Sequence, residues 1–562
     1  MSTNRVVSYD FSQATLQQLK NDRQYRNWPV IYILENRRQA YIGETTSALQ
    51  RIRNHLANRE RRIFNKLYLI KDEMFNKSAT LDLESSLIEY ISGDGTYTLQ
   101  NSNRGLRNHN YYNRQYYEQL FREIWDELRR HDIVKHSIRD IQNSDLFKYS
   151  PYKALTDDQA EIVAELEGII TSNRKSLSII RGEPGSGKTI LAIYLVKYLL
   201  SGDATAGLKI GIVLPQTSLR ATVGQIFRNI SGLKKNMVLG PNDVVKEDQQ
   251  FDLLIVDEAH RLNRRQNLAS YSAFDSAARK LGLDPAATDQ LDWILQKSRH
   301  TVLLYDGKQS VKPSDVAASR FTSLSPEPRQ FVLQSQMRVL AGDRYTGYID
   351  AILRQRNPQT QTFPGYDLRL YTRLQPMVSD IQQLNDQYGL CRLAAGFAWD
   401  WISRDNPQLF DIEIEDCRLK WNATTRNWIN SPNAHTEVGC IHTVQGYDLN
   451  YAGVIIGPEI TMDNGRVRYH PERYKDRHGK NKSLSPARMV DYILNIYKTL
   501  MTRGIRGTFV YACDPHLSHY LAGYLPVYQE GQAGGYGEAK ENEPAEQAAE
   551  AAPGYGVEEG ED

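Results

Sequence analysis

The glycine-rich segment at residues 182–189 carries the residue types that bind nucleotide phosphates. It follows the apolar residues 177–180 and precedes the apolar stretch ILAIYLVKYLL at residues 190–200. Glycines let backbone N–H groups turn toward phosphate oxygens, and the N-terminus of the following helix adds a positive dipole. The alternative, a chance glycine-rich turn, does not explain this strand–loop–helix order. The residues expected to bind the phosphates are Gly182, Glu183, Pro184, Gly185, Ser186, Gly187, Lys188 and Thr189.

A second chemical element is the acidic pair Asp257-Glu258, which ends the apolar strand at residues 252–256. Together with Thr189, Asp257 would complete a Mg²⁺ site, while Lys188 bridges the β- and γ-phosphates. Glu258 would sit near the γ-phosphate and polarise the attacking water. The alternative is a solvated strand end. The two elements together predict an ATPase that uses ATP and Mg²⁺.

These residues resemble the superfamily 1 helicases, and among them the Schlafen-type helicase domain, over about residues 150–525. The resemblance implies that Gln159 reads adenine and that Gln309 senses the γ-phosphate. It also implies that Arg338 and Arg503 complete the ATP site from a facing lobe, with Arg506 as an alternative to Arg503. The strand end reads DEAH, where many superfamily 1 members have a different fourth residue, so polarity and true unwinding stay open.

Two further segments resemble helicase motifs that contact nucleic acid, at residues 213–217 and 439–448. Trp399 and Trp401 are candidates for base stacking, with core packing as the alternative for at least one of them. The sequence does not distinguish DNA from RNA as the partner.

A different chemistry is indicated near the N-terminus by Tyr32, Tyr41, Arg51, His55 and Glu84. A helix over residues 49–55 would place Arg51 and His55 on one face, because they are four residues apart. Phosphodiester cleavage needs a proton acceptor, a cation near the scissile phosphate and a metal that stabilises the departing oxygen. The proton acceptor can be Tyr or His, the cation can be Arg, and the metal ligand can be Glu.

This set resembles the GIY-YIG nucleases over about residues 28–105. The first half of the signature reads Val30-Ile31-Tyr32 in place of GIY, whereas Tyr41-Ile42-Gly43 is intact. The resemblance implies that Glu84 binds Mg²⁺ or Mn²⁺ and that Asn101 or Asn103 is the distal asparagine of the family. The alternatives are a small α+β domain with packed tyrosines, and a nuclease fold that has lost catalysis.

The elements that must position these residues form an α/β chain. Two strands joined by a turn at residues 35–38, followed by helices at 47–57, 81–92 and 111–135, predict a small α+β unit. After Pro151, apolar strands alternate with helices, which is typical of parallel sheets. The strands of a first lobe are expected at 177–181, 209–214, 252–256 and 301–305, and those of a second at 330–334, 437–441, 452–456 and 508–512.

We therefore predict two RecA-like parallel-sheet lobes preceded by a GIY-YIG-like α+β domain. The expected boundaries are an N-terminal extension at 1–27, the nuclease-like domain at 28–130, a linker at 131–150, the two lobes at 151–329 and 330–527, and a disordered acidic tail at 528–562.

Charge and composition are compatible with this interpretation. From Gly531 onward the chain holds nine acidic side chains and one basic side chain, so residues 1–530 hold 68 basic against 58 acidic, a surplus of ten. A basic body favours a polyanion such as DNA, although an uneven solvated surface would give the same count. With no leader, no membrane-length apolar run and four scattered cysteines, we expect a cytoplasmic protein.

The leading hypothesis is an ATP-driven DNA motor coupled to a metal-dependent endonuclease, suited to DNA repair or defence against phage. A second hypothesis is an ATP-gated binding switch for DNA or RNA whose N-terminal domain is not catalytic. A small-molecule kinase would explain the phosphate loop but not the ordered motifs of the second lobe. The oligomeric state stays undetermined.

Overall fold

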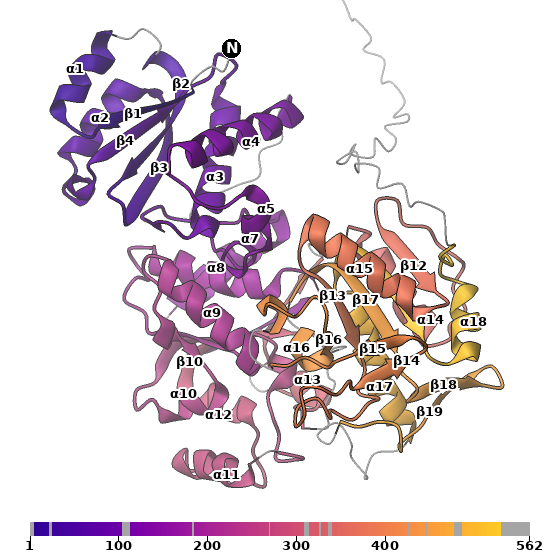
Figure 1. The fold of residues 1–562 in the computed structure, drawn as a ribbon. Coiled ribbons are helices and arrows are strands. Elements are labelled where there is room, and N and C mark those ends of the chain that lie inside the picture. Colours follow the sequence, from indigo (N-terminus) through magenta and orange to yellow (C-terminus); the bar gives the residue numbers. More distant parts are fainter. Residues whose placement is uncertain are drawn as a thin grey trace, which may run out of the picture.

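In the part of the chain that the structure describes, three sheets have five or six strands each, and two more are two-stranded. In this computed structural model the N-terminal unit lies against the first parallel-sheet lobe, and the second lobe stands beside it (Figure 1). The structure describes residues 5–21, 25–103, 113–172, 174–182, 185–268, 270–307, 314–324, 327–334, 340–424, 428–444, 447–476 and 486–529. Within these ranges every helix is too short or too polar to cross a lipid bilayer.

The N-terminal sheet has the order β1-β4-β2-β3-β5 and is antiparallel except for the β3–β5 pair. Its strands are β1 (Val6–Asp10), β2 (Arg26–Glu35), β3 (Gln39–Ser47), β4 (Lys66–Ile70) and β5 (Thr98–Leu99). The helices are α1 (Gln13–Asn21), α2 (Ala48–Ala57), α3 (Lys77–Asp94) and α4 (Arg114–Arg130). The expected hairpin and three helices are present, and the mixed α+β unit is confirmed.

One expectation for this unit is wrong. Residues 1–27 were expected to be an extension, but β1 pairs with β4 along its whole length and is the edge strand of the sheet. The carboxylate of Glu127, on α4, accepts a hydrogen bond from the backbone N–H of Val6 in β1 at 2.9 Å. The segment is therefore part of the folded unit, because its backbone groups find partners there.

The first lobe is a six-stranded parallel sheet with the order β11-β6-β10-β9-β7-β8. Its strands are β6 (Ser176–Gly182), β7 (Ile210–Val213), β8 (Val238–Leu239), β9 (Phe251–Val256), β10 (Ser298–Tyr305) and β11 (Arg329–Leu333). The helices are α7 (Asp157–Thr171), α8 (Lys188–Leu200), α9 (Thr217–Asn229), α10 (Pro241–Lys246), α11 (Tyr271–Lys280), α12 (Gln290–Lys297) and α13 (Ala318–Thr322).

The second lobe is a five-stranded parallel sheet with the order β12-β20-β17-β13-β16, so the predicted α/β class with two parallel sheets is confirmed. Its strands are β12 (Asp367–Tyr371), β13 (Cys391–Ala395), β16 (Val438–Cys440), β17 (Leu449–Ile456) and β20 (Gly504–Ala512). The hairpins β14 (Ile412–Ile414) with β15 (Cys417–Leu419) and β18 (Ile460–Asp463) with β19 (Arg466–Tyr469) lie outside it. The helices are α14 (Gly342–Leu353), α15 (Leu374–Tyr388), α16 (Ile441–Val444), α17 (Pro486–Met501) and α18 (Pro515–Ala522).

Two expectations about the second lobe are corrected. The strand expected at residues 330–334 to begin it is β11, which pairs with β6 in the first sheet, so that sheet extends past the expected boundary at residue 329. The start of the expected tail is also ordered. Tyr528 donates its backbone N–H to the carbonyl of Leu370 and stacks on Tyr371 with ring centroids 4.4 Å apart. Residues 530–562 lie outside the described residues.

The segment expected to be a linker contains two short helices, α5 (Ile138–Asn143) and α6 (Asp145–Lys148), which pack against α3. These helices also reach the second lobe. The side chain of Asn143 donates to the carbonyl of Tyr388 at 2.7 Å, and Lys148 donates to the carbonyl of Asp448 at 3.0 Å. The segment thus joins the N-terminal unit to the far lobe by polar contacts.

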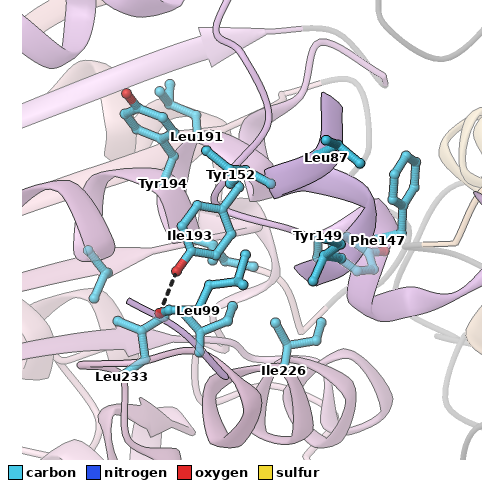
Figure 2. Packing of buried hydrophobic residues seen from close by; sticks show 14 of the residues in the cluster. Leu87, Leu99, Phe147, Tyr149, Tyr152, Leu191, Ile193, Tyr194, Ile226 and Leu233 are labelled. Atoms are coloured by element: carbon cyan, nitrogen blue, oxygen red, sulfur yellow. Dashed lines mark hydrogen bonds between the residues drawn. The ribbon is translucent and has the colours of Figure 1, made fainter. Parts of the chain in front are cut away.

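The N-terminal unit and the first lobe share one continuous apolar core. Figure 2 shows Tyr152 and Leu99 beside Leu191, Ile193 and Tyr194 of α8, the helix that follows the phosphate-loop sequence. The hydroxyl of Tyr152 donates to the carbonyl of Leu99 at 3.4 Å. Burial of this apolar surface away from water fixes the N-terminal unit on the first lobe.

Candidate functional site

The segment between β6 and α8 has the backbone that a phosphate-binding loop requires. Gly185 and Gly187 have φ angles of 92° and 78°, in the left-handed region that favours glycine. A side chain at Gly182 would have its Cβ 2.3 Å from Oγ of Ser186, so this position needs glycine for close approach. Helix α8 begins at Lys188, which directs its N-terminal N–H groups toward the loop. Glu183 and Pro184 lie outside the described residues.

Lys188 and Thr189 are the first residues of α8, and the side chains of both form hydrogen bonds within the protein. Nζ of Lys188 donates to the carbonyl of Gly182 at 2.6 Å and is almost wholly buried. The hydroxyl of Thr189 donates to Oδ2 of Asp257 at 2.6 Å, which joins the loop to the end of β9. The residues of the two sequence motifs therefore meet although they are 68 positions apart.

Asp257 and Glu258 are both buried, but their environments differ. Burial, with a further contribution from the charge of Glu258, raises the pKa of Asp257 to about 6. Burial would also raise the pKa of Glu258, but His260, Arg261 and Lys188 outweigh it and lower that pKa. Glu258 is thus held as a carboxylate, with Oε2 3.0 Å from Nε2 of His260.

The backbone of Glu258 has a φ angle of 52°, which is uncommon for a residue with a side chain. This turn brings the side chain back toward His260, the last residue of the DEAH sequence. Nδ1 of His260 accepts the backbone N–H of Asp306 at 3.4 Å, just past the end of β10. His260 was not among the predicted site residues, although its position in the DEAH sequence was a signal for a role there.

Gln159 lies beside the phosphate loop. Its Oε1 accepts the backbone N–H of Thr156 at the start of α7, and its Nε2 donates to the carbonyl of Ser186 at 3.3 Å. The side chain is fully buried. Gln309 and Arg338, by contrast, lie outside the described residues.

Residues of the two expected nucleic-acid segments meet at the boundary between the lobes. Nε2 of Gln216 donates to the carbonyl of His442 at 3.5 Å, and the hydroxyls of Thr222 and Tyr447 are 3.0 Å apart. Arg503 is buried just behind this contact and donates to the carbonyl of Tyr447 at 3.4 Å. The other candidate arginine, Arg506, lies elsewhere, 4.8 Å above the ring of Tyr388.

In the N-terminal unit, Tyr32 and Gly43 are partners across the β2–β3 pair. A Cβ atom at Gly43 would lie 2.2 Å from the hydroxyl of Tyr32, so the tyrosine ring occupies the space that a side chain would need. This explains physically why the intact Tyr41-Ile42-Gly43 sequence accompanies Tyr32. Gly43 was not among the predicted site residues, although it belongs to the intact Tyr41-Ile42-Gly43 sequence.

Tyr32 and His55 form a buried polar pair, with Oη of Tyr32 2.9 Å from Nε2 of His55. Burial raises the pKa of Tyr32, and the same effect together with Arg61 and Arg51 lowers the pKa of His55 to about 4. Near neutral pH the imidazole is therefore uncharged, so Nε2 can accept a hydrogen bond from the hydroxyl of Tyr32. The positive charge of Arg51 acts on both groups.

Tyr41 completes an aromatic cluster around this pair. Its ring centroid is 6.2 Å from that of Tyr32 and 5.3 Å from that of His55. The guanidinium of Arg61 stacks 3.8 Å above the Tyr41 ring, so a second arginine lies beside the cluster. Arg61 was not expected here, and the run of charged residues at 59–62 gave no sign of which arginine would turn inward.

Glu84 stands on α3 beside Glu44, which directly follows the Tyr41-Ile42-Gly43 sequence. Burial, with a further contribution from Glu44, raises the pKa of Glu84 to about 7. Lys77 forms an ion pair with Glu44, and the hydroxyl of Thr80 donates to Glu44 at 3.3 Å. Among the described residues, no three His, Cys, Asp or Glu side chains form a group that could hold a metal ion.

Asn101 and Asn103, the two candidates for the distal asparagine of the family, form hydrogen bonds with different parts of the protein. Asn101 exchanges two hydrogen bonds with the backbone of Ile42, at 3.1 and 2.8 Å, and so fixes the middle of β3. Asn103 reaches out of the unit instead, because its Nδ2 donates to the carbonyls of Pro151 and Tyr194 at 3.2 Å each. Asn101 is therefore the one that stabilises the strand of Tyr41.

Comparison with known proteins gives one family match. Residues 175–514 match the family described as Schlafen group 3, DNA/RNA helicase domain. An uncharacterized protein of Saccharomyces cerevisiae is 26% identical over 394 residues, which are 62% of this chain and 84% of the yeast protein.

Solved helicases are more distant. The Pif1 helicase from Bacteroides, in complex with ADP-AlF3 and single-stranded DNA, is 11% identical, covers 63% of this chain and 92% of its own, and has a TM-score of 0.27. The Arterivirus nonstructural protein 10 helicase with DNA is 12% identical, covers 61% of this chain and 63% of its own, and has the same TM-score of 0.27. At these TM-scores neither likeness places individual residues.

Proposed function

Because the match covers more than half of its length, this chain belongs to the Schlafen group 3 DNA/RNA helicase family, and from that premise we propose that it is an ATP-driven motor on nucleic acid. The observation that carries the proposal is the meeting of Lys188, Thr189 and Asp257 at one end of the first sheet. We further propose that the two parallel-sheet lobes act as RecA-like lobes that move against each other.

The residues present fit ATP and Mg²⁺ by their chemistry. Thr189 and Asp257 offer a hydroxyl and a carboxylate that already touch, and oxygen ligands are those that Mg²⁺ prefers. When bound, the ion would neutralise charge on the phosphates. Lys188 would exchange the carbonyl of Gly182 for a phosphate oxygen, and Glu258, held as a carboxylate, would accept a hydrogen bond from the attacking water.

Coupling between the ATP site and the second lobe is proposed to run through the lobe boundary. Arg503 donates to the carbonyl of Tyr447, and the hydroxyl of Tyr447 contacts that of Thr222. Thr222 belongs to α9, the helix that follows β7. A change in this contact would alter the path of any strand held by the segments at 213–217 and 439–448. In this proposal Arg338 and Gln309 keep the roles that the family resemblance implies.

For the N-terminal unit we propose metal-dependent endonuclease activity of the GIY-YIG type on DNA. The support is the buried pair of Tyr32 with neutral His55, beside Arg51 and Glu84. Hydrolysis forms one P–O bond from water and breaks the P–O bond to the departing strand. The proton of that water would pass through Tyr32 to Nε2 of His55, and Arg51 would hold the scissile phosphate.

Glu84 is the residue proposed to hold the metal, and Mg²⁺ or Mn²⁺ would stabilise the departing oxygen. Its environment is polar and acidic, with Glu44 beside it, which suits a divalent cation because two carboxylates then share one positive partner. In the structure Lys77 pairs with Glu44 and supplies positive charge at this place.

The engagement of Lys77 also favours a second candidate function, an ATP-gated binding switch whose N-terminal unit does not cut. An ammonium group that already neutralises Glu44 competes with a metal for the same charge. In that case ATP turnover would regulate attachment to DNA or RNA, and the aromatic cluster of Tyr32, Tyr41 and His55 would serve recognition.

A substrate panel separates the two functions. Single-stranded, duplex and forked DNA and a matched RNA are offered with Mg²⁺ or Mn²⁺, and ATP hydrolysis and strand cleavage are read from the same reactions. We expect strand-stimulated hydrolysis that is lost in Lys188→Ala and cleavage that is lost in Glu84→Ala and Arg51→Ala. Stimulated hydrolysis without cleavage of any substrate supports the switch, and cleavage that survives both nuclease-site variants rejects the proposed nuclease.

A further inference from the structure

A cavity of about 750 Å³ opens between the two lobes, and the described residues of the phosphate loop are not part of its wall. The second lobe supplies most of its wall, from the loop after β13, the segment after β15 and the start of α16. The first lobe supplies Asn263, Asn267 and Ser314. Its size is within the range of about 300–1000 Å³ that is usual for ligand sites.

Several aromatic rings line this wall together with polar and charged side chains. Phe397, Trp399, Trp401, Trp421 and His442 all line the cavity, and we call this set the aromatic cleft. Trp421 is its buried base, with the ring centroid of Phe397 at 5.9 Å in a nearly parallel orientation and that of Trp399 at 6.1 Å edge-on. Phe397, Trp399 and Trp401 are only half-buried, so their packing against protein is incomplete.

Charges around the cleft are nearly balanced, which excludes a simple phosphate trap. Nζ of Lys475 pairs with Asp400 at 2.9 Å, and Nε2 of His442 is 3.5 Å from Asp476. The guanidinium of Arg404 lies 5.7 Å from the Trp401 ring. A ligand with flat, largely uncharged faces and polar edges suits such walls, and nucleobases have these properties.

The cleft is also in the right place for a strand that crosses the lobes. His442 lines it, and the carbonyl of His442 is the group that Gln216 contacts from the first lobe. On the other side, Asn263 follows closely after Glu258 and Arg261, which end the acidic segment of the ATP site. An occupant would touch His442 at the nucleic-acid boundary and Asn263, which lies five residues after Glu258 in the sequence.

We propose that the aromatic cleft binds nucleobases of a single-stranded nucleic acid by stacking, with Trp399 and Trp401 as the principal faces. The proposal rests on the proposed motor function and specifies where that motor holds bases. Phe397 and Trp421 support the stacking face of Trp399. The amides of Asn263 and Asn267 offer donors and acceptors to base edges from the opposite lobe.

Equilibrium binding of labelled 20-mers of dT and rU tests the cleft, with an abasic DNA strand of the same length as the probe that lacks bases. Stacking on one aromatic ring contributes about 1–3 kcal/mol per base, which is about 5- to 150-fold in affinity. We expect Trp399→Ala and Trp401→Ala to weaken dT binding by at least about fivefold. Trp399→Phe should retain most of the affinity, because it keeps an aromatic face.

The abasic strand gives the decisive comparison. It should bind the parent protein more weakly than dT, and the two alanine variants should leave its affinity unchanged. Tyr271→Ala, which removes an exposed aromatic ring from α11, is the matched control and should leave dT binding unchanged. Comparison of dT with rU shows whether the bases come from DNA or RNA.

A second measurement does not depend on the folding of any variant. A 20-mer that contains 4-thiothymidine is photocrosslinked to the parent protein, and we expect the modified peptide to contain Trp399 or Trp401. The proposal is overturned if crosslinks fall elsewhere, or if the alanine variants weaken dT and abasic binding by the same factor. If the parent protein binds no single strand at all, the motor proposal fails together with the cleft.

Discussion

Thr189 donates its hydroxyl to Oδ2 of Asp257 at 2.6 Å, which joins the first turn of α8 to the end of β9. Both side chains offer oxygen ligands at the place where a nucleotide-bound Mg²⁺ would lie. Their contact ties the phosphate loop to the residue beside Glu258, so in the proposed ATPase this hydrogen bond would link the nucleotide contacts to water activation.

The first prediction follows from that pair. Thr189→Val and Asp257→Asn should each lower the ATPase kcat by on the order of 100-fold, since misplaced metal ligands commonly cost that much. Thr189→Ser retains the hydroxyl and should retain most of the activity. Steady-state ATPase assays over a Mg²⁺ series provide the measurement. Equal activity in the valine and serine variants would show that the hydroxyl is dispensable.

A second prediction concerns Gly43. In Gly43→Ala the new Cβ would lie 2.2 Å from the hydroxyl of Tyr32, so the ring must move and its contact with His55 is lost. We expect nicking to fall at least about tenfold and stability to fall by about 1–3 kcal/mol, the usual cost of overpacking. Tyr32→Phe separates the effects, because it should abolish nicking while keeping the ring and most of the stability.

The third prediction is a pH dependence of stability. The pKa of His55 is lowered to about 4, below the usual value of 6.5, so the unfolded chain binds this proton more readily than the folded chain. The contribution of His55 is complete above pH 6.5 and is lost as the pH falls from 6.5 toward 4. Urea unfolding at pH 7.5 and 5.0 should show a smaller difference for His55→Gln than for the parent protein.

The exposed His131 provides the control for that experiment. His131→Gln should reproduce the pH dependence of the parent protein. A His55→Gln variant with the same pH dependence as the parent would contradict the assignment of a neutral, buried His55.

A fourth prediction concerns the joint between the N-terminal unit and the first lobe. Tyr194, on α8, donates its hydroxyl to the carbonyl of Asn103 at 2.9 Å in a fully buried contact. Tyr194→Phe should cost about 1–2 kcal/mol, because a buried carbonyl loses this donor. Limited proteolysis over a temperature series should show the N-terminal unit released to protease ahead of the first lobe, and at a lower temperature than in the parent protein.

Tyr198→Phe is the matched control for the joint. Tyr198 is on the same helix, but its hydroxyl donates to Glu167 within the first lobe at 2.8 Å. This variant should not release the N-terminal unit to protease ahead of the first lobe. Release in Tyr198→Phe but not in Tyr194→Phe would show that the Asn103 contact does not hold the two parts together.

Local patterns predicted much of this structure. The strand, loop and helix around Lys188 are contiguous in the sequence, so glycine placement and apolar runs were enough to indicate them. The hairpin of Tyr32 and Tyr41 was indicated in the same way. In both places the geometry depends mainly on residues within about ten positions of one another.

The predictions that were wrong concerned features that depend on contacts between residues distant in the sequence. Strand β11 looks the same whether it pairs with β6 or begins a new sheet, and only its register against Arg181 and Gly182 settles the matter. Strand β1 is a short segment whose backbone finds partners 60 residues away in β4. The Glu44–Lys77 ion pair and the aromatic cleft likewise depend on tertiary packing, which composition and spacing do not encode.

The most direct test of the central claim, that ATP turnover moves this protein along a strand, is displacement of streptavidin from a biotinylated single strand. We predict displacement that requires ATP, stops in Lys188→Ala and has a preference for one end of the strand. Hydrolysis that is stimulated by the strand but displaces no streptavidin from either end would contradict the motor and support a binding switch.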